Sequence, residues 1–353
     1  MSSAAWLRVW QFVEEERNRD FVSPVAPASL AYNLAVCAHR EADYRLACLA
    51  FDQALRLAHP QEPLRRQAGN ALLHVLHEHQ VFAPTAEPTD HFLPTSVVVC
   101  SHEETRWQHF LNRNHAWLAH CQLVRIADAS GIAEAYTRGL AQVQHEQVLL
   151  CHDDIQLCAP NALARLSRSL QLYPLLTAVG ATAAQGVVWS GAGFEHCHGI
   201  VAYPEKAGVQ VSTYCLPEHI EATPPALLSC DGCFIAGRAQ VLKAVGFSPA
   251  LAHHFHGYDL DLALRSAQAG HRLGLISDLA LLHDSKGNYQ SDTWAQAATI
   301  LRDLHAPCRL PGQQVVANGM VLPDLAAYVQ LSQQLHRLGE QRHAQQGHLG
   351  LRN

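Results

Sequence analysis

Two adjacent carboxylates interrupt an apolar run in the middle of the chain. In VLLCHDDIQL (148–157), the apolar residues stop at His152, Asp153 and Asp154 before they resume. Two like charges this close repel each other, and both need solvent or a counter-ion. Hard divalent cations such as Mg²⁺ and Mn²⁺ prefer carboxylate oxygens, so one interpretation of the cluster is a metal site. The other is an Asp-rich turn that caps the helix predicted over residues 159–170.

A second group of acids lies downstream, in residues 253–288. Asp259 and Asp261 open a predicted helix there, and their i, i+2 spacing turns them in different directions. One can face a cleft while the other caps the helix or pairs with Arg265. His283 ends the apolar strand that follows, where a histidine is usually structural and can also be a ligand.

Three continuous apolar runs are expected to position these residues. Residues 95–101, 121–128 and 147–154 read as strands, and helical segments separate them. Strands of this kind alternating with helices form a parallel sheet that is covered on both faces. Ligands bind beyond the carboxyl ends of such strands. Ser101, Asp128 and the 152–154 cluster should therefore meet at one edge of the sheet.

The N-terminal part has a different pattern. Residues 28–60 predict a helical hairpin with its turn at Ala42–Asp43, and small residues at Ala35, Ala47 and Ala54 let the two helices approach closely. This hairpin resembles a tetratricopeptide repeat. It is either a helical packing module or a peptide-binding groove that would take a protein partner. Flanking helices are expected to cap it, because a lone repeat cannot form a solenoid.

Composition limits the class of protein. The chain has 353 residues, 48% of them hydrophobic, and a net charge of −6, which excludes the basic field of a nucleic-acid binder. No apolar run is long enough to span a membrane. Eleven cysteines without a small-domain framework predict reduced thiols and a cytoplasmic protein, with a peripheral position at the inner membrane face as an alternative. The predicted units are a helical module (1–82), a linker (83–94), a catalytic domain (95–305) and a helical tail (306–353).

The order of five segments resembles the large family-two group of inverting glycosyltransferases with the nucleotide-sugar A-type fold. The resemblance covers about residues 95–290, and its segments are VVVCS, IADASGIAEAYTRGLAQVQHEQVLLCHDDIQL, LLSCDGCFIAGRAQVLKAVGF, HGYDLDLALRSAQAG and LLHDS. It implies an α/β fold with a Rossmann-like mixed sheet, preceded here by the all-α tetratricopeptide-like module. It also implies a divalent cation, Mn²⁺ or Mg²⁺, as the cofactor.

The resemblance implies roles on the donor side. Ser101 and Asp128 stand where the family contacts the nucleotide, and Asp231 matches an acid of the donor-sugar and acceptor region. Asp153 is expected to support donor binding beside the metal. The implied donor is a nucleotide diphosphate sugar, with uridine diphosphate sugars expected first. The acceptor is a hydroxyl of a glycan, a lipid-linked precursor or a protein.

The resemblance also implies a metal site and a catalytic base. Asp154 matches the last acid of the family's DxD motif, and His152 replaces the first acid. His283 matches a position that completes the metal or diphosphate site in some relatives. Asp259 resembles the catalytic base, although Tyr258 stands where the family has Glu.

Three other interpretations remain open. A sugar-nucleotide pyrophosphorylase would share the sheet and the metal acids, but SHEETRWQ (101–108) lacks the Gly-rich basic loop of that class. A tetratricopeptide-type adaptor could carry a degenerate nucleotide-sugar-binding domain. Finally, Cys230 and Cys233 could bind zinc together with residues 195–198.

Overall fold

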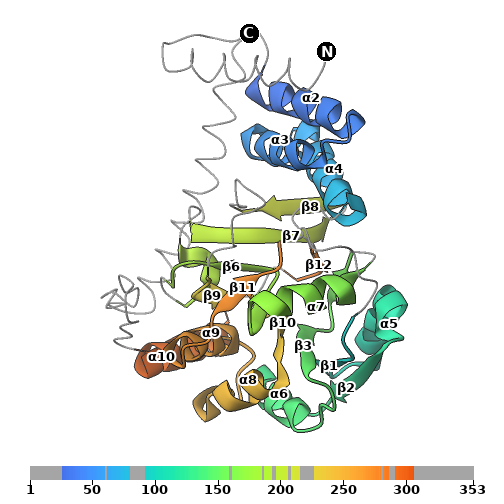
Figure 1. Ribbon diagram of the computed structural model, residues 1–353. Coiled ribbons are helices and arrows are strands. Elements are labelled where there is room, and N and C mark those ends of the chain that lie inside the picture. Colours follow the sequence, from blue (N-terminus) through green and yellow to red (C-terminus); the bar gives the residue numbers. More distant parts are fainter. Residues whose placement is uncertain are drawn as a thin grey trace.

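Figure 1 shows the computed structural model of the protein. The structure describes residues 26–59, 62–79, 92–158, 161–184, 187–192, 196–205, 208–214, 226–277, 279, 281–285 and 291–305. Most of the predicted linker and the whole predicted tail lie outside the described residues. Among the described residues, no helix combines the length and the apolar character needed to cross a membrane.

Three helices form the described portion of the N-terminal part, and the predicted hairpin is confirmed by the first two. In chain order they are α2 (Pro27–Arg40), α3 (Tyr44–Leu57) and α4 (Pro63–His79). Asp43 begins α3 by accepting a hydrogen bond from the Leu46 backbone N–H at 3.1 Å, as expected of an N-cap residue. Ala35, Ala47 and Ala54 are completely buried, which lets α2 and α3 pack closely.

The central sheet has six strands in the order β11-β5-β10-β3-β1-β2. Their bounds are β1 (Thr95–Cys100), β2 (Cys121–Ile126), β3 (Gln147–His152), β5 (Leu175–Thr177), β10 (Phe234–Arg238) and β11 (Leu273–Leu275). β1 runs parallel to both β2 and β3, whereas β10 is antiparallel to β3 and β5. The expected mixed α/β sheet, preceded by helices, is confirmed.

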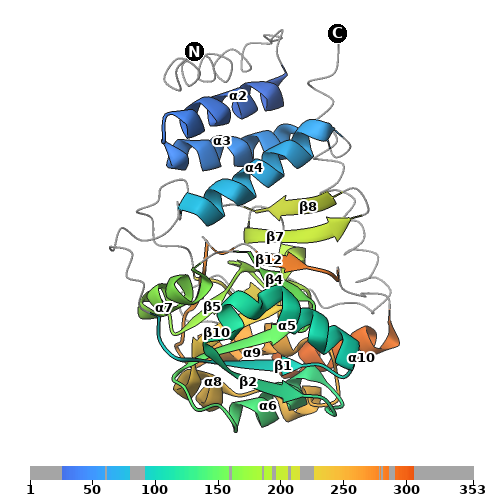
Figure 2. The same cartoon turned by 90° about the vertical axis from the view of Figure 1, so that its right-hand side faces the viewer.

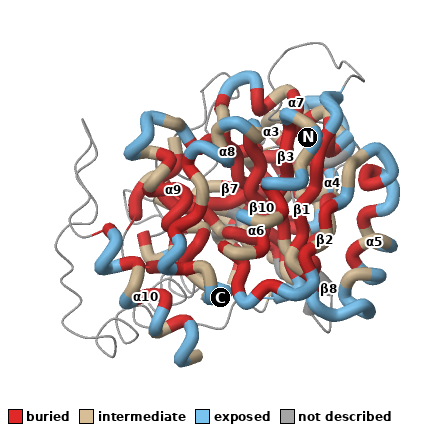
Figure 3. The backbone as a smooth tube through the Cα atoms, turned by 90° about the horizontal axis from the view of Figure 1, so that it is seen from below, coloured by how far each residue is buried: buried red, intermediate tan, exposed pale blue. Residues whose placement is uncertain are grey.

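Both faces of this sheet are buried, which explains the continuous apolar runs. The helices are α5 (Glu104–Leu118), α6 (Ile132–Leu140), α7 (Ala162–Leu172), α8 (Ala239–Val245), α9 (Tyr258–Gln268) and α10 (Asp292–His305), with short 3₁₀ turns η1 (Trp189–Ala192) and η3 (Pro249–Leu251). Val98 contributes to a core with α6, α8 and α9, whereas Val97 and Val99 contribute to a second core with α5 and α7. Successive side chains of a strand point to opposite faces, so a strand covered on both sides needs apolar residues throughout. Figure 3 shows β1, β3 and β10 as buried strands and α5 and α10 with exposed outer sides.

A second sheet lies between the central sheet and the N-terminal helices (Figure 2). Its order is β4-β12-β7-β6-β9, and β8 pairs with β7. The bounds are β4 (Ile155–Leu157), β6 (Val179–Ala181), β7 (Cys197–Glu205), β8 (Gly208–Thr213), β9 (Ser229–Cys230) and β12 (Leu281–His283). Ile200, Ala202 and Val211 from β7 and β8 belong to the same apolar core as α2, α3 and α4. The N-terminal helices therefore cover one face of the β7–β8 hairpin.

Arg165 adds a polar link between α7 and the N-terminal helices. Its side chain is completely buried, and its Nη1 donates a hydrogen bond to the backbone oxygen of Leu76 in α4 at 3.0 Å. A charged group is rarely buried unless it is paired or hydrogen-bonded. This contact links α7 directly to α4.

Candidate functional site

The three parallel strands end at one edge of the central sheet, as predicted. Cys100 at the end of β1 is in register with Ile126 of β2 and with His152 of β3. Ser101 follows β1 directly, Asp153 and Asp154 follow β3, and Asp128 stands two residues beyond β2. The helix-cap interpretation of the acids is wrong, because α7 begins after Asn161, and Asp153 and Asp154 form the turn between β3 and β4.

Asp153 is held by Ser101 and Arg106 and is not part of the candidate metal group. Its Oδ2 accepts a hydrogen bond from Ser101 Oγ at 2.8 Å, and its Oδ1 accepts from Arg106 Nη2 at 2.6 Å and Nε at 3.2 Å. Arg106 Nη2 also lies 3.6 Å from Asp154 Oδ2. Ser101 and Asp153 thus hold each other and the turn that carries Asp154. Arg106 did not stand out in the sequence, since nothing in its local pattern sets it apart from other helix-surface arginines.

Asp128 is the most exposed of the predicted site residues. Its side chain is 75% exposed and pairs with Arg138 Nη2 at 2.7 Å. It lies at the predicted edge but does not line the cavity described below. Its assignment to the nucleotide stays a prediction.

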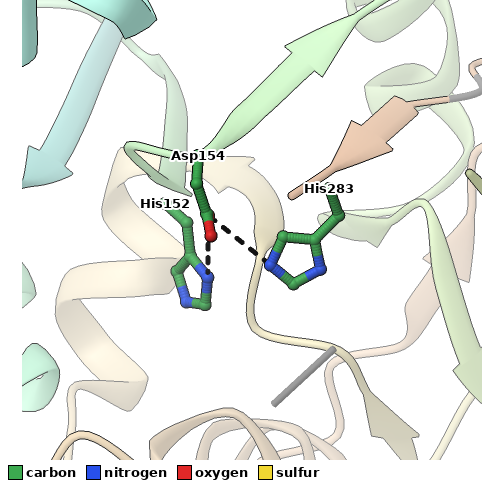
Figure 4. Close-up of side chains that lie close together, drawn as sticks. All are labelled: His152, Asp154 and His283. Carbon is green, nitrogen blue, oxygen red and sulfur yellow. Dashed lines mark ion pairs between the residues drawn. The ribbon is translucent and has the colours of Figure 1, made fainter. Parts of the chain in front are cut away.

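His152, Asp154 and His283 come together at the junction of the two sheets (Figure 4). Asp154 Oδ1 lies 3.7 Å from His152 Nδ1 and 3.5 Å from His283 Nε2. Two features bring β12 to this position: Ile155 of β4 is paired with His283, and the Asp284 backbone N–H donates to Asp154 O at 3.0 Å. The three predicted metal ligands thus form one cluster.

The cluster fits a divalent cation. Asp154 Oδ1 and His283 Nδ1 are buried and have no hydrogen-bond partner among the described residues, although such groups are normally satisfied. A cation bound to Asp154 would satisfy the carboxylate oxygen. Burial alone would raise the pKa of Asp154, but the nearby His283 and His152 outweigh it and hold that pKa below its ordinary value. Asp154 therefore stays ionised, as a ligand must be.

The two histidines differ in their surroundings. Burial lowers the pKa of His152, whose Nε2 lies 2.6 Å from the Tyr258 hydroxyl. This contact orients the ring so that Nδ1 faces Asp154, the way an outer partner orients a metal-binding imidazole. Burial also disfavours the charged form of His283, but Asp154 and Asp231 outweigh it and raise the pKa of His283. Tyr258, noted only as a departure from the family pattern, is thus a site residue.

Asp259 lies in the first turn of α9, where two backbone N–H groups hold its carboxylate. Oδ2 accepts from Gly232 N at 3.1 Å and Oδ1 from Leu260 N at 2.9 Å. A Cβ on Gly232 would lie 2.1 Å from the Tyr258 hydroxyl oxygen, so glycine is needed for this close approach. Burial, with the charge of Asp231 as a second cause, raises the pKa of Asp259 to about 7.

Asp231 directly follows β9 (Ser229–Cys230). Its Oδ1 accepts from the Cys233 backbone N–H at 3.0 Å and its Oδ2 from Trp189 Nε1 at 3.3 Å. Asp261 is buried on the other side of α9, where its Oδ1 lies 2.8 Å from His305 Nε2 and its Oδ2 accepts from Ser248 N. Of the two roles that the sequence left open for this acid, pairing with Arg265 is not seen, because Arg265 Nη2 donates to Val245 O.

A cavity of about 440 Å³ lies among the candidate site residues. Two of the three metal-ligand candidates, His152 and His283, line it together with Asp231 and Asp259, and its wall is rich in aromatic rings. The lining residues are His152, Val187, Val188, Trp189, Tyr203, Asp231, Gly232, Phe255, His256, Gly257, Tyr258, Asp259, Leu260, His283, Ser285 and Trp294. A partly apolar cavity with a few converging polar groups is typical of a small-molecule site.

The zinc interpretation built on Cys230, Cys233 and residues 195–198 does not hold within the described residues. No candidate metal group there joins Cys233 to Cys230, His196 or His198, and Glu195 lies outside the described part. Cys230 Sγ instead lies 3.7 Å from the backbone oxygen of Asp259.

No protein-family model and no curated protein matches this chain. It is similar in structure to GalNAc-T7 solved with UDP, GalNAc and Mn²⁺, at 10% identity and a TM-score of 0.41, over 70% of this chain and 57% of that one. It is also similar to the mannosyltransferase PcManGT from Pyrobaculum calidifontis in complex with GDP-Man and Mn²⁺, at 13% identity and a TM-score of 0.39, over 86% and 85%. A third is S. aureus TarS 1-349 in complex with UDP-GlcNAc, at 12% identity and a TM-score of 0.35, over 60% and 66%. The function proposed below rests on the residues of this chain.

Proposed function

We propose that this chain is a metal-dependent inverting glycosyltransferase, which moves a sugar from a nucleotide diphosphate to an acceptor hydroxyl. One observation carries the proposal. His152 and His283 line one cavity together with Asp259, a carboxylate with a pKa of about 7, and the ionised carboxylate of Asp154 lies beside both histidines. The metal ligands and the base are the two groups that the reaction needs.

The cation would be held by His152, Asp154 and His283. When bound, it would neutralise the negative charge that develops on the diphosphate leaving group. Ser101, Asp153 and Arg106 would act by holding the turn that presents Asp154, since they already hydrogen-bond to one another. Mn²⁺ and Mg²⁺ are the proposed ions.

Asp259 would accept the proton of the acceptor hydroxyl as that oxygen attacks the anomeric carbon. A base works best when its pKa is close to the working pH, and a pKa of about 7 meets that condition. Attack opposite the departing diphosphate inverts the anomeric centre. The proton moves to Asp259, and the electron pair of the broken bond leaves with the diphosphate.

The wall of the cavity supports a carbohydrate acceptor. Trp189, Tyr203 and Trp294 line it, and aromatic faces suit the apolar faces of sugar rings. We therefore propose a glycan acceptor ahead of a lipid-linked precursor or a protein. The donor proposed from the resemblance is a uridine diphosphate sugar. The cytoplasm is the proposed compartment, since the nine described cysteines are free thiols.

The adaptor alternative is not favoured. A degenerate domain would not be expected to keep Asp259 and His283 on one cavity, with Asp154 next to His283. The N-terminal helices also share their core with β7 and β8, so part of their apolar surface is already covered. A protein partner of these helices remains a separate proposal.

A screen of nucleotide diphosphate sugars with the purified full chain, in Mn²⁺ and in Mg²⁺, tests the function. Transfer or donor hydrolysis is expected with one nucleotide and is expected to vanish when a chelator is added. Asp259→Asn should bind the nucleotide diphosphate with Mn²⁺ in calorimetry but lose transfer. Asp154→Ala should lose the metal-dependent binding itself. Asp303→Asn on α10, where the carboxylate is exposed, is the matched control. Unchanged transfer in Asp259→Asn or Asp154→Ala would refute the proposal.

A further inference from the structure

His283 belongs to a second group of potential ligands. Asp231, Cys233 and His283 each offer a ligand atom, and these atoms all lie within 4.8 Å of one another. The group differs from His152, Asp154 and His283 by containing sulfur. The segment that carries Asp231 and Cys233 is tied to β3, because the His152 backbone N–H donates to Cys233 O at 3.1 Å.

Each member of this group can accept a cation. Cys233 is completely buried, and both Asp231 oxygens keep a lone pair beside the one used for a hydrogen bond. His283 Nδ1 is buried without a hydrogen-bond partner among the described residues. Figure 4 shows the two ring nitrogens of His283 on different sides, one of them toward Asp154. Buried polar atoms normally have a partner, so an unpaired ring nitrogen at this position is a candidate ligand for an ion.

We propose that Asp231, Cys233 and His283 form a second cation site, which binds a thiophilic divalent ion such as Zn²⁺. A thiolate selects softer ions than Mg²⁺ or Mn²⁺, and one sulfur, one nitrogen and one oxygen ligand suit zinc. Three protein ligands would leave a fourth position open, and two of these ligands, Asp231 and His283, line the cavity. Binding releases the thiol proton to solvent, since the metal ligand is the thiolate.

The two sites compete for one imidazole. A neutral imidazole has a single nitrogen lone pair, so His283 serves one ion at a time. Zinc at the second site therefore removes His283 from Asp154 and His152. A thiophilic ion at the second site would therefore take one ligand from the first site and displace the ion bound there. Only this regulatory consequence rests on the proposed function, since the zinc site itself requires no sugar transfer.

Cobalt reports the site directly, because a thiolate bound to Co²⁺ absorbs in the near ultraviolet and oxygen or nitrogen ligands do not. Titration of the chelator-treated full chain with Co²⁺ should produce this absorption in the wild type. It should be lost in Cys233→Ser and retained in Cys230→Ser, the matched control, whose buried sulfur lies next to Asp259 O. Its absence in the wild type, its persistence in Cys233→Ser or its loss in Cys230→Ser would overturn the proposal.

A second variant covers the case in which Cys233→Ser does not fold. Asp231→Asn keeps the thiol and weakens one ligand, so half of the absorption should need at least about tenfold more Co²⁺. An unchanged titration would contradict the assigned ligand set.

Competition between the sites is measured by electron paramagnetic resonance of free Mn²⁺. Zn²⁺ added to the Mn²⁺-loaded protein should release Mn²⁺, and Cys233→Ser should need at least about tenfold more Zn²⁺ for the same release. Equal release curves would show that Cys233 has no part in it. Both measurements follow the bound metal and not sugar transfer. A failed sugar-transfer assay would therefore leave the zinc site standing, and a failed metal measurement would leave the proposed transfer standing.

Discussion

Leu282 and His283 are neighbours on β12, yet they serve opposite sides of the second sheet. Leu282 packs against the core that β7 and β8 share with the N-terminal helices, whereas His283 Nε2 lies 3.5 Å from Asp154 Oδ1. This follows from the alternation of side chains along a strand. The N-terminal helices therefore support, from behind, the strand that carries a metal-ligand candidate.

Shortening Leu282 should weaken both the fold and the metal site. Leu282→Ala removes apolar contacts of a partly buried side chain and is expected to lower the free energy of unfolding by about 1–3 kcal/mol, measured in urea. Mn²⁺ affinity of the folded variant should fall as well, because β12 is less firmly held. Leu172→Ala, at a leucine that is 57% exposed on α7, should stay within about 0.5 kcal/mol of the wild type. Unchanged Mn²⁺ affinity in Leu282→Ala would show that the helices do not position His283.

The rate of transfer should depend on the ionisation of Asp259. Since its pKa is about 7, the protonated form dominates below that pH and cannot accept a proton. At saturating Mn²⁺, kcat/KM should rise about tenfold per pH unit below pH 7 and level off above it. Any residual rate of Asp259→Asn should lack this inflection. If the variant keeps the same inflection, another group is responsible for it.

Asp259 should also affect stability, with the sign set by its raised pKa. Its folded-state pKa of about 7 lies above the ordinary value of 3.8, so the unfolded chain ionises first as pH rises. The resulting stabilisation is complete below pH 3.8 and is lost as pH rises through 7. Asp259→Asn should thus raise the melting temperature over the wild type more at pH 8 than at pH 5. Asp303→Asn should show no such difference, and an equal gain at both pH values for Asp259→Asn would count against the buried charge.

The hydroxyl of Tyr258 should matter for metal binding. Tyr258→Phe removes the group 2.6 Å from His152 Nε2, and loss of such an orienting contact weakens metal affinity about tenfold or more. Tyr136→Phe is the matched control in calorimetry with Mn²⁺. Its ring lies 5.6 Å from that of Tyr258, but its buried hydroxyl has no hydrogen-bond partner among the described residues. Equal effects of the two substitutions would contradict an orienting role for Tyr258.

Local features of the sequence were sufficient to predict several parts of this protein. The apolar run at Val97, Val98 and Val99 predicted a strand covered on both faces, and Ala42–Asp43 predicted the turn of a helical hairpin. The shared edge of the three parallel strands followed from their common direction. Asp154 was favoured over Asp153 as the metal ligand by resemblance, and the structure places it between the two histidines.

The sequence by itself determined the residue types, the strand periods and the edge at which polar side chains gather. The tertiary structure decided which of them meet. It set Asp153 against Ser101 and Arg106, brought Tyr258 to His152, and gave His283 both Asp154 and the pair Asp231 and Cys233 as neighbours. The physical reason is that alternation along a strand is a local property, whereas the face that a side chain takes depends on pairing with strands far away in the chain. Nothing in the spacing of residues 148–157 indicates that β12 pairs beside them.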